Sequence, residues 1–107
     1  MKTDELRACA CVETPLAVSA EECAGYLAGL SGWVISDGQL SRVFHFENFH
    51  ATMAFVNAVA WIAHTTDHHP SLEVGYRTCR VIYHTHSLSG LSLNDFICAA
   101  RIDALLE

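Results

Sequence analysis

Apolar residues recur at helical spacing in three stretches of the chain, and each stretch follows a residue that caps helices. Ser19 and Glu22 form a capping box and predict a helix that runs through Leu30. Asn48 precedes the longest stretch, whose apolar stripe consists of Phe49, Met53, Val56, Ala60 and Ala63, widened by Phe55, Val59 and Ile62. Ser92 opens the last stretch, which carries Leu93, Phe96, Ile97, Ala100 and Leu105. The pattern therefore predicts three helices.

Four shorter stretches alternate between apolar and polar positions, as strands do. Residues 33–36 and 40–46 flank Asp37-Gly38, a dipeptide typical of two-residue hairpins. Residues 72–76 and 79–85 alternate in the same way. The predicted order α-β-β-α-β-β-α indicates an α+β fold, in which a four-stranded antiparallel sheet carries three helices on one face.

Composition narrows the class of protein. The chain has 107 residues, of which 51% are hydrophobic and 17% charged, so a single folded domain is expected. We place that domain at residues 16–107 and expect residues 1–15 to form an irregular N-terminal tail. The net charge of −6 argues against nucleic-acid binding. No apolar run has the length of a membrane span and the first residues lack a secretory signal, so we expect a cytoplasmic protein.

The chain contains five cysteines, an odd number, with no C-x-x-C pair. In a reducing compartment we expect Cys23, Cys79 and Cys98 to be small buried hydrophobic residues. Cys9 and Cys11 have the spacing of a redox or metal pair, but they lie in a segment with little periodicity. We interpret that segment as a frayed tail.

Titratable residues gather where the central helix should end. In the stretch TTDHHP, Pro70 disfavours helical backbone at His69, so the helix is expected to stop there. His64 and His68 are four positions apart and would share a helix face, while His84 and His86 share a strand face. A fold that brings the helix end beside the end of the last strand would gather His68, His69 and His86 in one pocket.

Three interpretations of these histidines compete. They are solvated groups at a helix end, where the helix dipole favours a positive charge. They bind a metal, because His-x-x-x-His is the spacing of zinc-binding helices, although residue 65 is Thr where the H-E-x-x-H motif has its glutamate. They act as an acid and a base, because imidazole titrates near neutral pH. Spacing alone does not decide between metal binding and catalysis.

A longer pattern surrounds these histidines. It consists of His64, His68-His69-Pro70, Tyr76 at the end of a strand, His86, and Asp95 beyond a glycine turn. With this pattern the chain resembles the pterin-4a-carbinolamine dehydratase family. The similarity extends to residues 32–33, 44–46, 49 and 90–92, and so spans roughly residues 19 to 106. One position departs from the family, which often has Glu where this chain has His64.

The resemblance implies an activity and a mechanism. The family removes water from 4a-hydroxytetrahydropterin, the product that aromatic amino acid hydroxylases release, and forms quinonoid dihydropterin. This elimination needs an acid for the leaving hydroxyl and a base for a ring N–H, with no metal, nucleophile or redox cofactor. The family also implies the same α+β fold and association into dimers or pairs of dimers.

The resemblance also assigns roles to residues. The catalytic residues would be His68, His69 and His86. His68 and His86 would form the acid–base pair, and His69 would contact the pterin beside them. Further substrate contacts would come from Asp67, His84, Thr85 and Ser87. His64 and Asp95 would be supporting residues, and Asp95 has a second, structural explanation because it stands at the capping-box position behind Ser92.

Two other functions fit the same sequence. Animal relatives serve as a dimerisation cofactor of a homeodomain transcription factor, so the chain could be a non-catalytic binding module. It could also act on another pterin, for example in molybdenum-cofactor metabolism. The expected partners are accordingly the pterin itself, a second copy of the chain, and a transcription factor or an aromatic amino acid hydroxylase.

Overall fold

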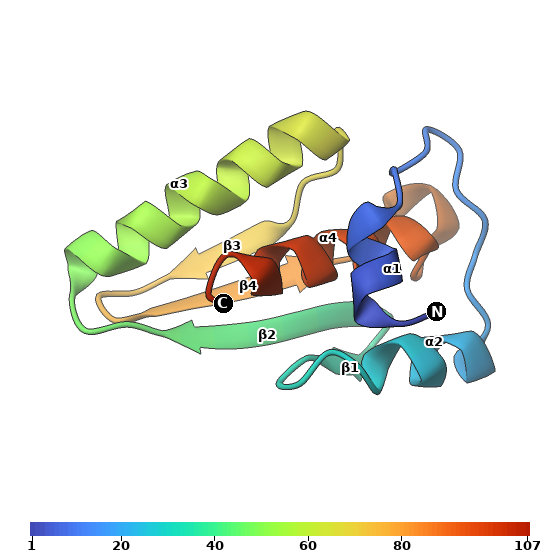
Figure 1. The fold of residues 1–107 in the computed structure, drawn as a ribbon, viewed down its shortest axis with the longest axis horizontal. Helices are drawn as coiled ribbons and strands as arrows, with labels where there is room; N and C mark the ends of the chain where they lie inside the picture. Colours follow the sequence, from blue (N-terminus) through green and yellow to red (C-terminus); the bar gives the residue numbers. More distant parts are fainter.

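The computed structural model describes all residues, 1–107, and contains four α-helices, a short 3₁₀ helix and one four-stranded sheet (Figure 1). In chain order the elements are α1 (Thr3–Ala8), α2 (Ala20–Leu27), β1 (Val34–Ser36), β2 (Gln39–His45), α3 (Phe49–Thr66), β3 (Ser71–Val74), β4 (Thr78–Tyr83), η1 (His86–Leu88) and α4 (Leu93–Ala104). The predicted α+β class and the order of the seven expected elements are confirmed. None of the helices combines the length and the apolar character that a membrane span requires.

The sheet is antiparallel throughout, with the strand order β1-β2-β4-β3. The predicted hairpin joins β1 to β2, where Ser36 pairs with Gln39 across Asp37 and Gly38. Asp37 and Gly38 have φ angles of 52° and 74°, the left-handed backbone that a tight two-residue hairpin turn requires. Aspartate and glycine tolerate this backbone better than other residues, so the dipeptide fixes the register of β1 against β2.

The two faces of the sheet differ in what covers them. Leu40 and Phe44 of β2, with Cys79, Val81 and Tyr83 of β4, are buried in the core that the sheet shares with the helices. The opposite face has no helix on it. On that face Val34 and Val43 are 56% and 45% exposed, so apolar surface stays open to solvent.

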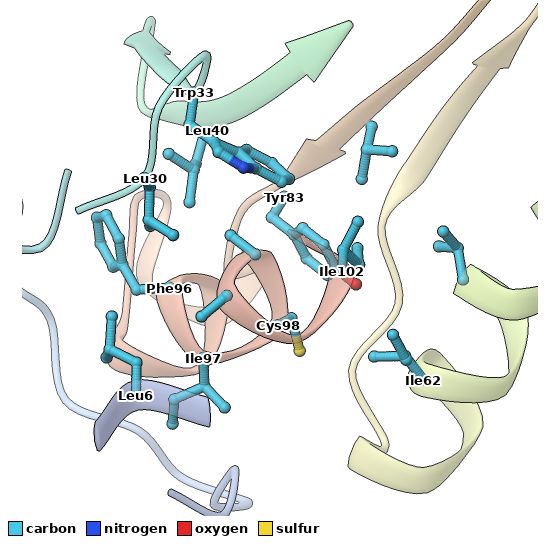
Figure 2. Close-up of a cluster of buried hydrophobic side chains, with 14 of the residues drawn as sticks. Leu6, Leu30, Trp33, Leu40, Ile62, Tyr83, Phe96, Ile97, Cys98 and Ile102 are labelled. Carbon is cyan, nitrogen blue, oxygen red and sulfur yellow. The ribbon is translucent and has the colours of Figure 1, made fainter. Parts of the chain in front are cut away.

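Helix α4 lies at the centre of the helical layer (Figure 1). Its residues from Asn94 to Ala100, and Ile102, are buried, because α1 packs on one side of α4 while α3 and the sheet lie on others. Figure 2 shows the side chains of Phe96, Ile97, Cys98 and Ile102 projecting from α4 into this cluster. The core therefore surrounds α4, and α4 carries Asp95 and Cys98 into it.

The N-terminal segment differs from the prediction of an irregular tail over residues 1–15. Thr3–Ala8 form α1, and the side chain of Leu6 is fully buried against α4 (Figure 2). Arg7 anchors the helix further, since its Nε donates to the carbonyl of Ala100 at 2.9 Å. A helix of six residues is too short to be stable alone, so packing on α4 must hold it in place. Leu6 is the one large apolar residue of α1, so the segment has no apolar periodicity from which the helix could be predicted.

The apolar stripe of α3 is also centred differently from the prediction. The residues turned into the core are Thr52, Phe55, Val59 and Ile62. Phe49, which the pattern placed in the stripe, is 48% exposed and stacks on Tyr76, with ring centroids 6.1 Å apart. Because α3 is apolar on most sides, the sequence could not show which side faces the sheet.

Candidate active site

The end of α3 releases its histidines from the helix. Asp67 adopts left-handed backbone, with φ 52° and ψ 39°, and its N–H donates to the carbonyl of Ala63. The N–H of His68 donates to the same carbonyl at 3.3 Å, which closes the last turn. Aspartate is one of the few residues that adopt this backbone readily. Chain direction thus changes at Asp67, and His68 and His69 leave the axis of α3.

His68 turns inward and meets a buried carboxylate. Its Nε2 lies 2.6 Å from Oδ1 of Asp95, and its ring stacks on Tyr83 with centroids 5.4 Å apart. The His68 side chain is 15% exposed, whereas that of Asp95 is fully buried. The hydrogen bond to Asp95 raises the pKa of His68 above its ordinary value, although burial works in the opposite direction. His68 is therefore protonated over a wider pH range than a free histidine.

Asp95 is held by donors from two other segments. Its Oδ2 accepts a hydrogen bond from the Thr85 hydroxyl at 2.8 Å and from the Ser92 N–H at 2.9 Å. The bond from Ser92 is the backbone half of the capping box that was expected at the start of α4. A carboxylate that caps a helix and accepts from Thr85 presents its second oxygen to His68. Asp95 thus joins the helix cap to the histidine.

Replacing Asp95 with asparagine tests this pair. The shape and the cap acceptor are kept, but the charge that raises the pKa of His68 is lost. Because the pKa of His68 is raised in the folded chain, protonated His68 stabilises the fold. This stabilisation is complete below about pH 6.5, the pKa of an unperturbed histidine, and is lost as the pH rises through the pKa of His68 in the folded chain. We expect Asp95→Asn to cost about 1.5–3 kcal/mol of unfolding free energy near pH 5.5 and clearly less near pH 9. Urea unfolding at both pH values measures the difference, and equal costs would contradict the ion pair.

The chain after β4 forms the opposite wall of the site. The N–H of Thr85 donates to the carbonyl of Gly90 at 2.8 Å, and η1 makes a short loop between them. This loop places His84 and His86 side by side, with Nε2 of His84 3.0 Å from Nδ1 of His86. At that distance one ring donates a hydrogen bond to the other, so the two rings hold one another in orientation.

These two walls enclose a pocket of about 220 Å³. Its lining includes every residue to which the resemblance gave a substrate contact, namely Asp67, His68, His69, His84, Thr85, His86 and Ser87. The predicted meeting of the helix end with the end of the last strand is therefore seen. Asp95 lies behind His68 rather than on the pocket surface. The lining is mostly polar and rich in imidazole, which suits proton transfer to a polar ring.

His64 does not reach the pocket. It lies exposed on α3 and packs beside Trp61, with ring centroids 5.6 Å apart. His64 and His68 would share a helix face only if α3 continued to residue 68. The left-handed backbone of Asp67 ends the helix before that point. His64 is therefore not one of the residues that line the pocket.

No sequence pattern indicated that the N-terminal segment contributes to the pocket. Val12, Glu13 and Pro15 line it, together with Asn94 of α4. Asn94 fixes the segment, since its amide donates to the carbonyl of Val12 at 2.8 Å and its oxygen accepts from the Val12 N–H at 3.0 Å. Contacts between segments so distant in the chain leave no local pattern. The one possible signal in the sequence was Asn94, a polar residue next to the apolar residues of the predicted last helix. A polar residue that is buried there needs hydrogen-bond partners, and Val12 supplies them.

Comparison with known proteins decides the family. The family model described as pterin 4 alpha carbinolamine dehydratase matches residues 16–105, which is most of the chain. The chain belongs to this family. Its members are dehydratases, that is, hydro-lyases. The resemblance found in the sequence is thereby confirmed.

Relatives and solved structures agree with this family. A relative from Nitrosomonas eutropha that carries the family's name is 56% identical over 87 residues, which is 80% of this chain and 77% of the relative. Another, from Nitrosospira multiformis, is 47% identical over 107 residues, covering 100% of this chain and 93% of its own. The crystal structure of a transcriptional coactivator/pterin dehydratase from Brucella melitensis superposes with a TM-score of 0.81 at 28% identity, over 86% of this chain and 100% of that one.

A second solved structure is more distant. It is a pterin dehydratase-like protein described as a RuBisCO assembly factor in the alpha-carboxysome, with a TM-score of 0.57 and 26% identity. The match covers 68% of this chain and 84% of that one. The names of these two solved structures thus include roles other than dehydration, namely transcriptional coactivation and RuBisCO assembly.

Proposed function

We propose that this chain dehydrates 4a-hydroxytetrahydropterin to quinonoid dihydropterin and water, and that it does so in the cytoplasm. The observation that carries the proposal is the arrangement of His68 and His86 on the lining of one pocket, with His68 hydrogen-bonded to the buried Asp95. An imidazole pair in a polar pocket supplies the two proton transfers that this elimination needs. No metal or redox cofactor takes part in the reaction as proposed.

The elimination breaks one C–O bond and forms one C=N bond. An acid gives a proton to the 4a-hydroxyl, which leaves as water, and a base removes the proton of the neighbouring ring nitrogen. The electron pair of that N–H bond becomes the new π bond. His68 and His86 are the proposed acid–base pair, and one histidine can act in either protonation state near neutral pH.

Asp95 prepares His68 for this step. The carboxylate accepts hydrogen bonds from Thr85 and Ser92. Because a carboxylate has no proton to donate, it is also the acceptor in its bond to His68, and the proton of that bond lies on Nε2 of His68. Nδ1 is then the nitrogen of His68 that is left for the substrate. In the protonated ring Nδ1 donates, and in the neutral ring it accepts. Asp95 is thus proposed as a positioning residue rather than a proton donor.

The remaining lining residues are proposed to bind the pterin ring. His69 and Asp67 come from the end of α3, and His84, Thr85 and Ser87 from the segment after β4. His86 and Ser87 of that segment are exposed and are proposed to offer polar groups to the edge of the ring. Two segments that each present several polar groups favour a flat, polar heterocycle over an aliphatic substrate.

Binding of a stable pterin tests the substrate class. We expect 7,8-dihydrobiopterin to bind the wild-type chain, and His69→Ala to weaken the dissociation constant by roughly two- to tenfold, as the loss of one hydrogen bond does. His45→Ala is the matched control, because His45 is exposed on β2 and does not line the pocket. Isothermal titration calorimetry measures all three. Equal affinities for His69→Ala and the wild type would remove His69 from the pterin site.

A non-catalytic role is the second candidate. The Brucella structure is named a transcriptional coactivator as well as a pterin dehydratase, and the more distant neighbour is named an assembly factor. A binding module for a transcription factor or an aromatic amino acid hydroxylase would keep the fold without needing the histidines. A third candidate, action on a pterin of molybdenum-cofactor metabolism, would use the same pocket. The calorimetric titration with a pterin separates the non-catalytic binding module from the two functions that act on a pterin.

We also propose that the chain forms a homodimer or a pair of dimers. The face of the sheet without helices exposes Val34 and Val43, and a sheet half-open to solvent is commonly completed by a second copy. Light scattering at micromolar concentration should give twice or four times the mass of one chain. A Val43→Lys variant should lower that mass if this face is the interface, and a monomeric wild type would contradict the proposal.

A further inference from the structure

Two of the five cysteines lie in contact. The Sγ atoms of Cys11 and Cys98 are 3.8 Å apart, although 87 residues separate them in the chain. Both are free thiols, and no other pair of cysteine sulfurs makes such a contact. Cys98 projects from α4 into the core (Figure 2), whereas Cys11 is half-buried in the segment that follows α1. The pair therefore joins the N-terminal segment to the helix at the centre of the fold.

The two sulfurs have different chemical character. The hydrogen bond from Cys11 lowers the pKa of Cys98 to about 7, against the effect of burial. The same contact raises the pKa of Cys11. The hydrogen bond between the two sulfurs therefore favours the loss of one proton from the pair, which leaves a thiolate beside a thiol. A thiolate beside a thiol is the arrangement from which disulfides form.

Cys11 is also within reach of a small oxidant. It lines a hollow of about 310 Å³ together with Val12, Glu13, Thr65, Thr66 and Asp67. Cys98 has no exposed surface. A peroxide that enters this hollow can therefore reach Cys11, whereas Cys98 is buried and contacts only the sulfur of Cys11 among the cysteines.

We propose that Cys11 and Cys98 are a redox-modification site that closes into a disulfide and ties residues 10–15 to α4. The proton that the two sulfurs share first passes to Cys98, and the Cys11 thiolate then attacks hydrogen peroxide. The O–O bond breaks, Cys11 becomes a sulfenic acid, and the hydroxide that leaves takes up the proton given up by the pair and becomes the first water. Cys98 then releases its proton beside the sulfenic sulfur of Cys11. The Cys98 thiolate attacks that sulfur, the S–S bond forms, and hydroxide departs. The hydroxide takes up the proton that Cys98 released and becomes the second water. Two thiols are thus oxidised by two electrons, and one peroxide is reduced to two waters.

The disulfide would act on a segment that lines the histidine pocket. Val12 and Glu13, the next residues after Cys11, belong to the lining, and only the two hydrogen bonds of Asn94 are otherwise seen to hold Val12 to α4. A covalent bond at Cys11 would restrict the opening of this wall. The formation of the bond itself does not depend on the proposed dehydratase activity.

Peroxide treatment of the full chain tests the proposal. The product should be lighter by two hydrogen atoms, a peptide digest should join Cys11 to Cys98, and dithiothreitol should reverse both changes. Because the bond closes a long loop, the melting temperature should rise by roughly 10 °C. Amide exchange over residues 10–15 should slow by at least roughly tenfold, because local opening of the tied segment becomes rarer.

Cys11→Ala should abolish all four changes, whereas Cys23→Ala should keep them. Cys23 is the matched control because it is also a half-buried free cysteine and lies in α2, outside the pair. A gain of oxygen on separate cysteines, a bond between Cys9 and Cys11, or the same rise in melting temperature in Cys11→Ala would overturn the proposal.

Discussion

Replacing either His68 or His86 by a residue without a titratable ring should slow dehydration of 4a-hydroxytetrahydropterin by roughly ten- to ten-thousand-fold, the range for losing one general acid or base. Because a carbinolamine also dehydrates spontaneously, the observed loss is bounded by the uncatalysed rate. Stopped-flow turnover of pterin generated by an aromatic amino acid hydroxylase measures it. Wild-type rates in both variants would mean that neither histidine takes part in the dehydration, and they would favour the non-catalytic role.

The two positions need different substitutions. His86 is exposed, so His86→Ala should leave the stability of the fold nearly unchanged. His68 is hydrogen-bonded to a buried carboxylate, and His68→Ala would leave Asp95 short of a donor at a cost of about 1–3 kcal/mol. His68→Gln keeps an N–H donor without the ability to transfer a proton. It therefore separates the loss of chemistry from the loss of stability.

Two further variants sharpen this experiment. His50→Ala is the matched control, since His50 is an exposed histidine of α3 that does not line the pocket, and its rate should equal that of the wild type. The double variant of His68 and His86 should lose less than the product of the two single losses, because both residues serve one elimination. Fully multiplicative losses would mean that the two histidines act in independent steps.

Leu6→Ala should lower the free energy of unfolding by about 2–5 kcal/mol, the range for truncating a fully buried leucine. The Leu6 side chain is completely buried, and it belongs to the same cluster as Phe96 and Ile97 of α4. Leu16→Ala is the matched control, because Leu16 follows in the same N-terminal region and is 85% exposed. Its effect should stay within about 0.5 kcal/mol.

Urea unfolding of the two leucine variants measures this difference. A large loss for Leu6→Ala alone would place α1 within the cooperative fold. Equal stabilities would mean that the segment before residue 16 is the loose tail that the sequence suggested, and that Val12 and Glu13 form no lasting wall of the pocket.

Local signals in the sequence predicted the elements that build the site. Asp37-Gly38 fixed the first hairpin, because only a few residues adopt its backbone. Ser19 and Ser92 marked helix starts through their capping partners. Pro70 predicted that α3 would end close to the histidines, and the helix ends at Thr66, just before His68 and His69. Each of these signals acts over a few residues, so it survives without knowledge of the tertiary fold.

The parts that were not predicted depend on contacts between distant segments. The helix at Thr3–Ala8 forms because Leu6 packs on α4, and a lone leucine carries no periodicity. The wall at Val12 exists because Asn94 binds its backbone from the far end of the chain. His64 was grouped with His68 by spacing, but the backbone of Asp67 separates them. Such outcomes follow from packing, which a single sequence does not display.

The central claim is that the pocket of His68 and His86 dehydrates a pterin carbinolamine, and the direct measurement is the rate of that dehydration. Freshly generated 4a-hydroxytetrahydropterin is mixed with the chain in the presence of a metal chelator, and formation of quinonoid dihydropterin is followed by absorbance. The account predicts a rate above the spontaneous one that rises in proportion to the wild-type chain. It also predicts a return toward the spontaneous rate with the His68→Gln/His86→Ala double variant. A wild-type chain that adds nothing to the spontaneous rate, or whose activity vanishes with the chelator, would contradict it.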